Sequence, residues 1–197
     1  MIPVLLEGDV DVPMVEKLLH HVGLEIGTVY GLQGKGQVDR RLRNYNAAAR
    51  HAPWFVLRDL NGDAHCAPGL IRDLLPAPAR QMCFRIAVRA AEAWMLADRE
   101  RAAGFLSVRE AWIPENPDEL ERPKVELVRL ARRSRRRAVR RDMVPSEGTS
   151  GVVGPGYSAR MIEFIVNHWR PEVAAMRSPS LARSIEAMRT WAANIVR

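Results

Sequence analysis

Cysteine and long apolar runs are what this 197-residue sequence has least of. Its two cysteines, Cys66 and Cys83, have neither the spacing of a zinc finger nor the density of a secreted disulfide scaffold, so we expect a protein of the reducing cytoplasm. No apolar run approaches the roughly 20 residues that span a bilayer, and residues 1–7 contain no basic leader. We therefore expect neither a membrane partner nor a signal peptide.

Acidic charge is also in short supply. The chain has 23 Asp and Glu against 30 Lys and Arg, which gives a formal net charge of +7 with neutral histidine. This excess of positive charge favours a polyanionic partner. Hydrophobic residues make up 47% of the chain and charged residues 27%, an ordinary globular balance. The length suits one α/β core with a helical extension.

Short apolar runs alternate with helical patterns in the first half of the chain. Strands are expected at residues 2–6, 24–32, 54–58 and 82–88. This alternation predicts an α/β fold with a mainly parallel sheet of about four strands.

Beyond Asp98 the strand pattern fades. We therefore divide the chain into an α/β core, 1–98, and a helical extension, 99–197, packed on the core as one compact unit. Within the extension, Ser178-Pro179 makes a good helix start. The last helix is expected to bury residues at three- and four-residue spacing, namely Leu181, Ile185, Met188 and Trp191 or their neighbours.

Acidic side chains follow three of the predicted strands. Glu7 comes directly after the first strand, and Asp59 follows the third, with Asn61 and Asp63 just beyond it. Glu92 lies near the start of the helix after the fourth. Parallel strand ends converge on one edge of a sheet, where ligands bind, and a hard cation such as Mg²⁺ relieves the repulsion between clustered carboxylates. The alternatives are ordinary polar turns and, for Glu92, complementation of a helix dipole.

A glycine-rich loop, residues 31–36, carries Lys35. It lacks the Walker A pattern, which needs Gly-Lys-Ser/Thr entering a helix. We interpret it as a flexible loop, with phosphate contact as the less favoured alternative.

Arginine is concentrated in a helix expected from Lys124 to about Asp142. Its arginines are Arg129, Arg132, Arg133, Arg135, Arg136, Arg137, Arg140 and Arg141. A solvated charged face is one explanation, but this density favours contact with phosphates. The candidate contacts with a DNA or RNA backbone are Arg129, Arg132, Arg133, Arg136, Arg137 and Arg140.

The motifs together resemble the Toprim domain of topoisomerases, bacterial primases, recombination mediators and OLD-family nucleases. The resemblance begins with Glu7-Gly8 and Asp11 after a strand and continues with an Asp-x-Asp-type motif at Asp59 after a later strand. Further blocks are Ala87–Asp98, Arg122-Pro123-Lys124, Gly156-Tyr157-Ser158 and Ser178-Pro179-Ser180-Leu181. They resemble a prokaryotic Toprim-like family of unknown function that is often linked with defence against mobile elements.

The resemblance implies a Toprim-like Rossmann-type core that binds Mg²⁺ or Mn²⁺. Glu7 would be a metal ligand or general acid/base, Asp59 a metal ligand and Glu92 a further ligand. Asn61 stands where the pattern has its second aspartate, so metal affinity should fall unless Asp63 substitutes. Lys124 would steady phosphate or transition-state charge; a solvated lysine at a helix start is the alternative.

Two functions follow from these features. The first is a divalent-metal-dependent nuclease, or a related phosphoryl-transfer enzyme, acting on DNA or RNA in prokaryotic defence. The second is a catalytically degenerate Toprim-like subunit that binds nucleic acid or acts as a sensor in a larger complex. A third interpretation is an arginine-rich nucleic-acid-binding protein whose acids only cap turns. The sequence leaves room for a homodimer or for a partner protein of a defence system.

Overall fold

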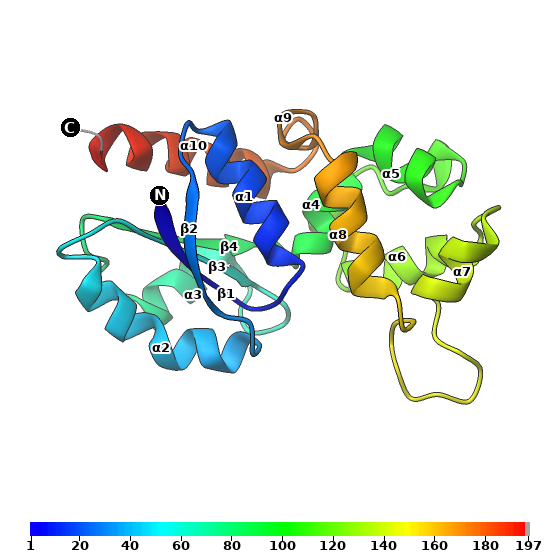
Figure 1. Cartoon of the computed structure of the whole chain (residues 1–197), viewed down its shortest axis with the longest axis horizontal. Coiled ribbons are helices and arrows are strands. Elements are labelled where there is room, and N and C mark those ends of the chain that lie inside the picture. The colour runs from blue at the N-terminus through cyan, green and yellow to red at the C-terminus, as the bar shows by residue number, and fades with distance from the viewer. Residues whose placement is uncertain (196–197) are drawn as a thin grey trace.

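The computed structural model describes residues 1–195 and contains one four-stranded sheet (Figure 1). Its strands are β1 (Ile2–Leu6), β2 (Ile26–Gly31), β3 (Trp54–Asp59) and β4 (Met82–Ala87). They lie in the order β2-β1-β3-β4, and every neighbouring pair is parallel. The predicted α/β fold with a parallel sheet is confirmed, and the strand positions agree with the apolar runs.

Helices cover both faces of the sheet (Figure 1). One face packs against α1 (Asp11–His21) and α10 (Pro179–Ile195), the other against α2 (Lys35–Ala48) and α3 (Ala67–Leu74). Alternate residues of β3 point to opposite faces. Phe55 and Leu57 therefore belong to the first core, and Trp54 and Val56 to the second.

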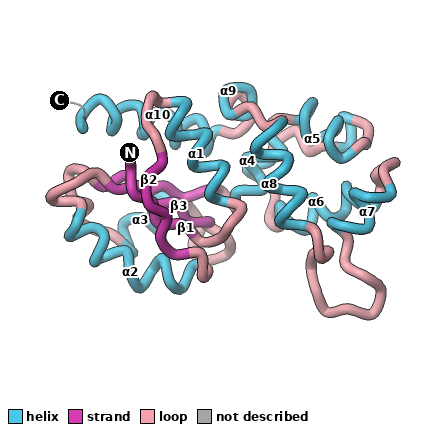
Figure 2. The backbone as a smooth tube through the Cα atoms, in the orientation of Figure 1, coloured by secondary structure: helices cyan, strands magenta, loops and turns pink. Residues whose placement is uncertain are grey.

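The remaining helices form a lobe beside the sheet (Figures 1 and 2). They are α4 (Ala91–Ala97), α5 (Arg99–Leu106), α6 (Pro123–Arg132), α7 (Arg137–Met143), α8 (Tyr157–Asn167) and α9 (Pro171–Ala174), with 3₁₀ turns at Glu110–Trp112 and Pro117–Glu119. The fully buried α4 joins the lobe to the sheet. Its Trp94 Nε1 donates to Ser180 Oγ at 2.7 Å, and Trp169 Nε1 donates to the Trp94 carbonyl at 3.0 Å.

The last helix, α10, returns from the lobe to the sheet and packs on β4. The burial expected of Leu181, Ile185, Met188 and Trp191 is confirmed, since each is at most 6% exposed. Trp191 Nε1 also donates to the Gln81 carbonyl just before β4, at 3.1 Å. The end of the predicted extension is thus a layer of the α/β core. None of the helices within residues 1–195 is long and apolar enough to cross a membrane.

The prediction of a single arginine-rich helix from Lys124 to about Asp142 is wrong. The structure has two helices, α6 and α7, with a break at residues 133–136. Within the break, Ser134 Oγ accepts a hydrogen bond from Arg136 N at 3.0 Å, and Arg135 N donates to the carbonyl of Ser107 at 3.2 Å. A serine that bonds the nearby backbone competes with the helical hydrogen-bond pattern, which explains the interruption.

Asp98, between α4 and α5, pairs with Arg170 just before α9, and we expect the loss of this contact to destabilise the fold. Its fully buried carboxylate accepts hydrogen bonds from Arg170 N, Nε and Nη2 at 3.0, 2.9 and 2.7 Å. Because Asp98→Ala leaves the guanidinium without its buried partner, the free energy of unfolding should fall by about 3 kcal/mol in denaturant titration. Glu100→Ala removes the exposed partner of the same arginine and should change it by less than about 1 kcal/mol.

Candidate functional site

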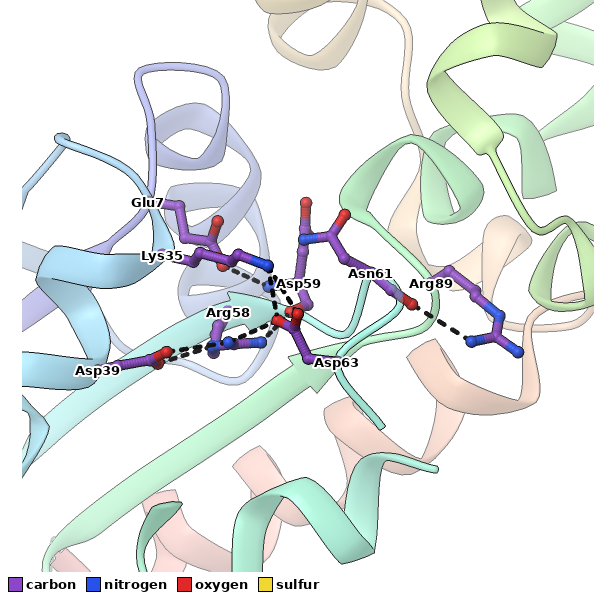
Figure 3. Close-up of polar contacts among 8 residues, drawn as sticks. All are labelled: Glu7, Lys35, Asp39, Arg58, Asp59, Asn61, Asp63 and Arg89. Atoms are coloured by element: carbon purple, nitrogen blue, oxygen red, sulfur yellow. Dashed lines mark hydrogen bonds and ion pairs between the residues drawn. The ribbon is translucent and has the colours of Figure 1, made fainter. Parts of the chain in front are cut away.

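The carboxyl ends of β1 and β3 bring Glu7 and Asp59 side by side (Figure 3). The backbone N–H of Asp59 donates to Glu7 Oε1 at 2.8 Å. The backbone N–H of Ala91, at the start of α4, donates to Asp59 Oδ1 at 2.9 Å. Because Glu92 is the next residue, α4 carries its carboxylate to the same sheet edge. Three of the acids expected from the sequence are therefore gathered at one place.

Asp11 is a fourth member of this cluster, although acids near a helix start commonly serve only to complement the helix dipole. Its carboxyl accepts a hydrogen bond from Gly8 N at 2.9 Å, which closes the turn between β1 and α1. Burial, followed by the charges of Glu7 and Glu92, raises the pKa of Asp11 to about 7. The sequence feature that could have placed Asp11 in the cluster is its spacing from Glu7 across the strand-to-helix turn.

The pKa values of Asp59 and Glu7 are raised as well. Burial raises the pKa of Asp59 well above its usual value, and the charges of Asp11, Glu92 and Glu7 raise it further. Burial also raises the pKa of Glu7, although the hydrogen bond from Asp59 N opposes that shift. Like charges in a desolvated site favour the protonated forms. A cation at this edge would favour the ionised forms instead.

Glu92 is buried, at 6% exposure, and is held by two residues of the lobe. Its Oε1 accepts a hydrogen bond from the Tyr157 hydroxyl at 3.1 Å, and Lys124 Nζ lies 3.4 Å from the same oxygen. Burial and the charge of Glu92 raise the pKa of Tyr157, so its hydroxyl stays a donor. Lys124 therefore lies beside the acid cluster. Tyr157, which the sequence showed only within a block of the Toprim-like resemblance, is a further site residue.

The Asp63 carboxylate points toward Lys35 and Arg58 (Figure 3). Lys35 Nζ lies 2.7 Å from Asp63 Oδ1, and Arg58 Nη2 lies 2.7 Å from Oδ2. Both cations lower the pKa of Asp63. Arg58 is only 3% exposed and also pairs with Asp39 at 2.7 Å. The structure thus places Asp63, a predicted metal ligand, in an ion-pair network that fixes the loop after β3.

Asn61 occupies a backbone position that suits an asparagine. Its φ of 50° lies in the left-handed region, which asparagine adopts more readily than most residues. Its N–H donates to the Arg89 carbonyl at 2.7 Å, and its own carbonyl accepts from Arg89 Nη1 at 3.2 Å (Figure 3). The turn therefore gives a structural reason for the amide at this position.

A cavity of about 550 Å³ opens beside the cluster. Asp59, Asn61 and Glu92 line one part of it, and its basic lining residues are Arg89, Arg122 and Lys124. The volume is that of an ordinary small-ligand pocket. Carboxylates and basic side chains that line one cavity suit a phosphate group accompanied by a cation.

The chemistry of the carboxylate oxygens suits a divalent cation. Glu7, Asp59 and Glu92 each use one carboxylate oxygen in the hydrogen bonds above, and the second oxygen of each receives no hydrogen bond from residues 1–195. Carboxylate oxygens are the ligands that Mg²⁺ and Mn²⁺ prefer. As the side chains are placed, no three His, Cys, Asp or Glu of the described chain form a group that could hold a metal ion.

The arginines of α6 and α7 lie on the surface and differ in their partners. Arg129 pairs with Glu126, Arg141 with Asp142, and Arg140 donates to the Ser134 carbonyl. Arg133 and Arg109 lie over the ring of Trp112, at 5.0 and 4.3 Å from its centroid. Four exposed arginines between Arg129 and Arg141 make no ion pair, no side-chain hydrogen bond and no contact with an aromatic ring within residues 1–195, and we call them the free arginine set: Arg132, Arg135, Arg136 and Arg137.

Comparison with models of known protein families, with curated proteins and with solved structures found no match for this chain. The Toprim-like resemblance therefore remains a prediction, and the functional proposal rests on the geometry of the site.

We expect Asp11→Asn to stabilise the metal-free protein, and to do so more at pH 8 than at pH 5. The pKa of Asp11 is about 7 in the fold against an ordinary value of 3.8, so ionisation destabilises the folded state increasingly as pH rises between those values. Asparagine removes the charge and keeps an oxygen for the Gly8 N–H. Unfolding midpoints measured with a chelator test this, with the exposed Asp9→Asn as control. A gain at pH 5 equal to that at pH 8 would contradict it.

Proposed function

We propose that the chain is a divalent-metal-dependent nuclease, or a related phosphoryl-transfer enzyme acting on nucleic acid, of the Toprim-like kind and active in prokaryotic defence. The observation that carries the proposal is the cluster of Glu7, Asp11, Asp59 and Glu92 at the sheet edge, beside a cavity with basic lining residues. Desolvated carboxylates that raise one another's pKa are typical of functional sites.

Each residue of the cluster has a distinct part in this proposal. Glu7, Asp59 and Glu92 would hold Mg²⁺ or Mn²⁺, which when bound supplies stabilisation of charge on the attacking and leaving oxygens. Lys124, 3.4 Å from Glu92, neutralises that carboxylate and can donate to a phosphate oxygen in the cavity. Tyr157 holds Glu92 by its hydroxyl. These contacts orient the site before substrate binds.

Helix α6 connects the cavity with the free arginine set. Pro123 and Lys124 line the cavity at its first turn, and Arg132 is its last residue. Ten helical residues span about 15 Å, roughly the axial rise of four base pairs. A nucleic-acid backbone whose scissile phosphate lies in the cavity can therefore reach the arginines, which would bind phosphates without reading sequence.

The ion pairs of Asp63 favour a second candidate function. With Asp63 held by Lys35 and Arg58, and with an uncharged amide at Asn61, the segment from Asp59 to Asp63 contributes one free carboxylate, that of Asp59. A binding or sensor subunit without catalysis would have this reduced acid set. Metal-dependent cleavage separates the two functions.

Metal binding and cleavage should depend on Asp59 and be independent of Asp63. In calorimetric titrations of metal-free protein we expect saturable Mn²⁺ binding that is weakened at least about tenfold by Asp59→Asn, with a parallel loss of Mg²⁺-dependent cleavage of oligonucleotides. Asp63→Asn also removes one negative charge, in the loop that follows Asp59. It should leave the Mn²⁺ affinity within about twofold of the wild-type value, because the Asp63 carboxylate faces Lys35 and Arg58.

Two results would contradict the proposal that the chain is a metal-dependent enzyme. The first is the absence of Mn²⁺ binding to the wild-type chain at millimolar metal, and the second is equal weakening by both variants. Metal binding without cleavage of any DNA or RNA substrate would favour the sensor subunit.

Nucleic-acid affinity should depend on the free arginine set. Changing Arg132, Arg135, Arg136 and Arg137 together to glutamine should weaken binding of a short duplex and reduce the slope of log affinity against log salt by up to about 4, roughly one for each phosphate that is no longer neutralised. The matched control changes Arg40, Arg41, Arg43 and Arg50 to glutamine, which removes the same charge from exposed positions on and after α2, at the far side of the molecule (Figure 1).

Fluorescence anisotropy at several salt concentrations measures both variants. Equal effects of the two would mean that net charge, and not this surface, governs binding.

A further inference from the structure

A second cavity, of about 380 Å³, lies at the outer edge of β4, between α3 and the first turns of α10. Three arginines line it: Arg85 from β4, Arg89 from the turn after β4, and Arg183 from α10. Ser180 and Ser184 of α10 and His65 of the loop before α3 add further polar groups. This cluster is separate from the acid cluster and has the opposite charge.

Two of the residues that line this cavity each have a buried polar atom without a partner. Arg85 Nε and Ser184 Oγ are both shielded from solvent, and neither makes a hydrogen bond within residues 1–195. Ser184 is only 1% exposed. The described chain has three such side-chain atoms in all, the third being Arg99 Nε. Buried polar groups are nearly always hydrogen-bonded, so two unpaired donors on residues that line one cavity point to a missing acceptor.

The charge of the cavity is uncompensated as well. Neither Arg85 nor Arg183 makes an ion pair within the described residues, and burial together with the charge of Arg183 lowers the pKa of Arg85. Asp118 is the single carboxylate among the lining residues. Its oxygens accept from Ser178 Oγ at 2.6 Å and Ser180 N at 2.7 Å, so this carboxylate caps the start of α10.

We propose that this cavity binds a phosphate group, whose oxygens accept hydrogen bonds from Arg85 and Ser184 and whose charge is neutralised by Arg183 and Arg89. Guanidinium and hydroxyl groups are common phosphate partners, and arginine presents several donors in a fixed geometry. A doubly charged oxyanion matches an excess of two positive charges, since three arginines face one carboxylate here. The cavity is large enough for a phosphate with part of a sugar attached.

The two cavities are neighbours because Arg89 lines both. A phosphate in the second cavity therefore lies next to the place proposed for the scissile phosphate. In the proposed enzyme it belongs to the nucleic-acid strand being cut, and this assignment of its source rests on the proposed function. Binding of phosphate itself does not.

Calorimetric titration of inorganic phosphate into the metal-free chain, with a chelator present, tests the site directly. We expect saturable binding to the wild type that is at least about tenfold weaker in Arg85→Gln and in Arg183→Gln, as for the loss of one charged hydrogen bond. Arg183 is exposed, so its variant should fold even if Arg85→Gln does not; thermal unfolding of each variant checks this. Arg189→Gln removes the same charge from α10 on the side that faces His21 and Glu186, and should bind phosphate as the wild type does.

Absence of phosphate binding to the wild type would overturn the proposal, as would equal weakening in Arg189→Gln. Binding that Arg183→Gln abolishes would support it.

Three ligands then distinguish the source of the phosphate, all without metal: inorganic phosphate, an oligonucleotide with a 5′-phosphate and the same oligonucleotide with a 5′-hydroxyl. A preference for the 5′-phosphate that disappears in Arg183→Gln identifies a terminal phosphate. Equal binding of both oligonucleotides, weakened by Arg183→Gln, identifies a backbone phosphate, and binding of inorganic phosphate alone identifies a free anion. Phosphate binding by a chain that cleaves no nucleic acid would support the phosphate site and contradict the proposed nuclease. Cleavage without phosphate binding would support the nuclease and contradict the phosphate site.

Discussion

Repulsion between carboxylates at the carboxyl end of the sheet is the constraint around which the site is built. Glu7, Asp11 and Asp59 are each held by a backbone N–H, those of Asp59, Gly8 and Ala91. Glu92 instead depends on side chains from the lobe, the hydroxyl of Tyr157 and the ammonium of Lys124. The parallel sheet thus gathers the acids, and α6 and α8 supply the charge and the donor that hold the fourth acid in place.

The sequence allowed the fold to be predicted because its apolar patterns are local. Four short apolar runs became the four strands, and the spacing of Leu181, Ile185, Met188 and Trp191 correctly predicted the buried side of α10. The prediction of one long arginine helix failed because its break combines a local hydrogen bond, from Arg136 N to Ser134 Oγ, with one from Arg135 N to the carbonyl of Ser107, 28 residues away. Periodicity within a segment does not reveal a competing partner elsewhere in the chain.

The site was predictable in the part that topology determines. Parallel strands place Glu7, Asp59 and the start of α4 at one edge, so their meeting follows from the order of the elements. Side-chain pairings across long separations were not predictable: Asp63 pairs with Lys35 at the start of α2, and Tyr157 of α8 donates to Glu92. The place of Arg85 in the second cavity was not predictable for a different reason: it interrupts an apolar run that otherwise indicates only a buried strand.

The return of α10 to the sheet affects how the chain can fold during synthesis. The face of the sheet that includes Phe55 and Cys83 is completed by side chains of α10, and the bond from Trp191 to Gln81 joins residues 110 apart in sequence. Domains whose contacts are distant in sequence fold slowly, since the intervening chain must be ordered first. On a ribosome the part of this face that α10 covers stays open until residues 179–195 have emerged, so the cavity beside β4, which α10 lines, is completed only after the lobe has been made.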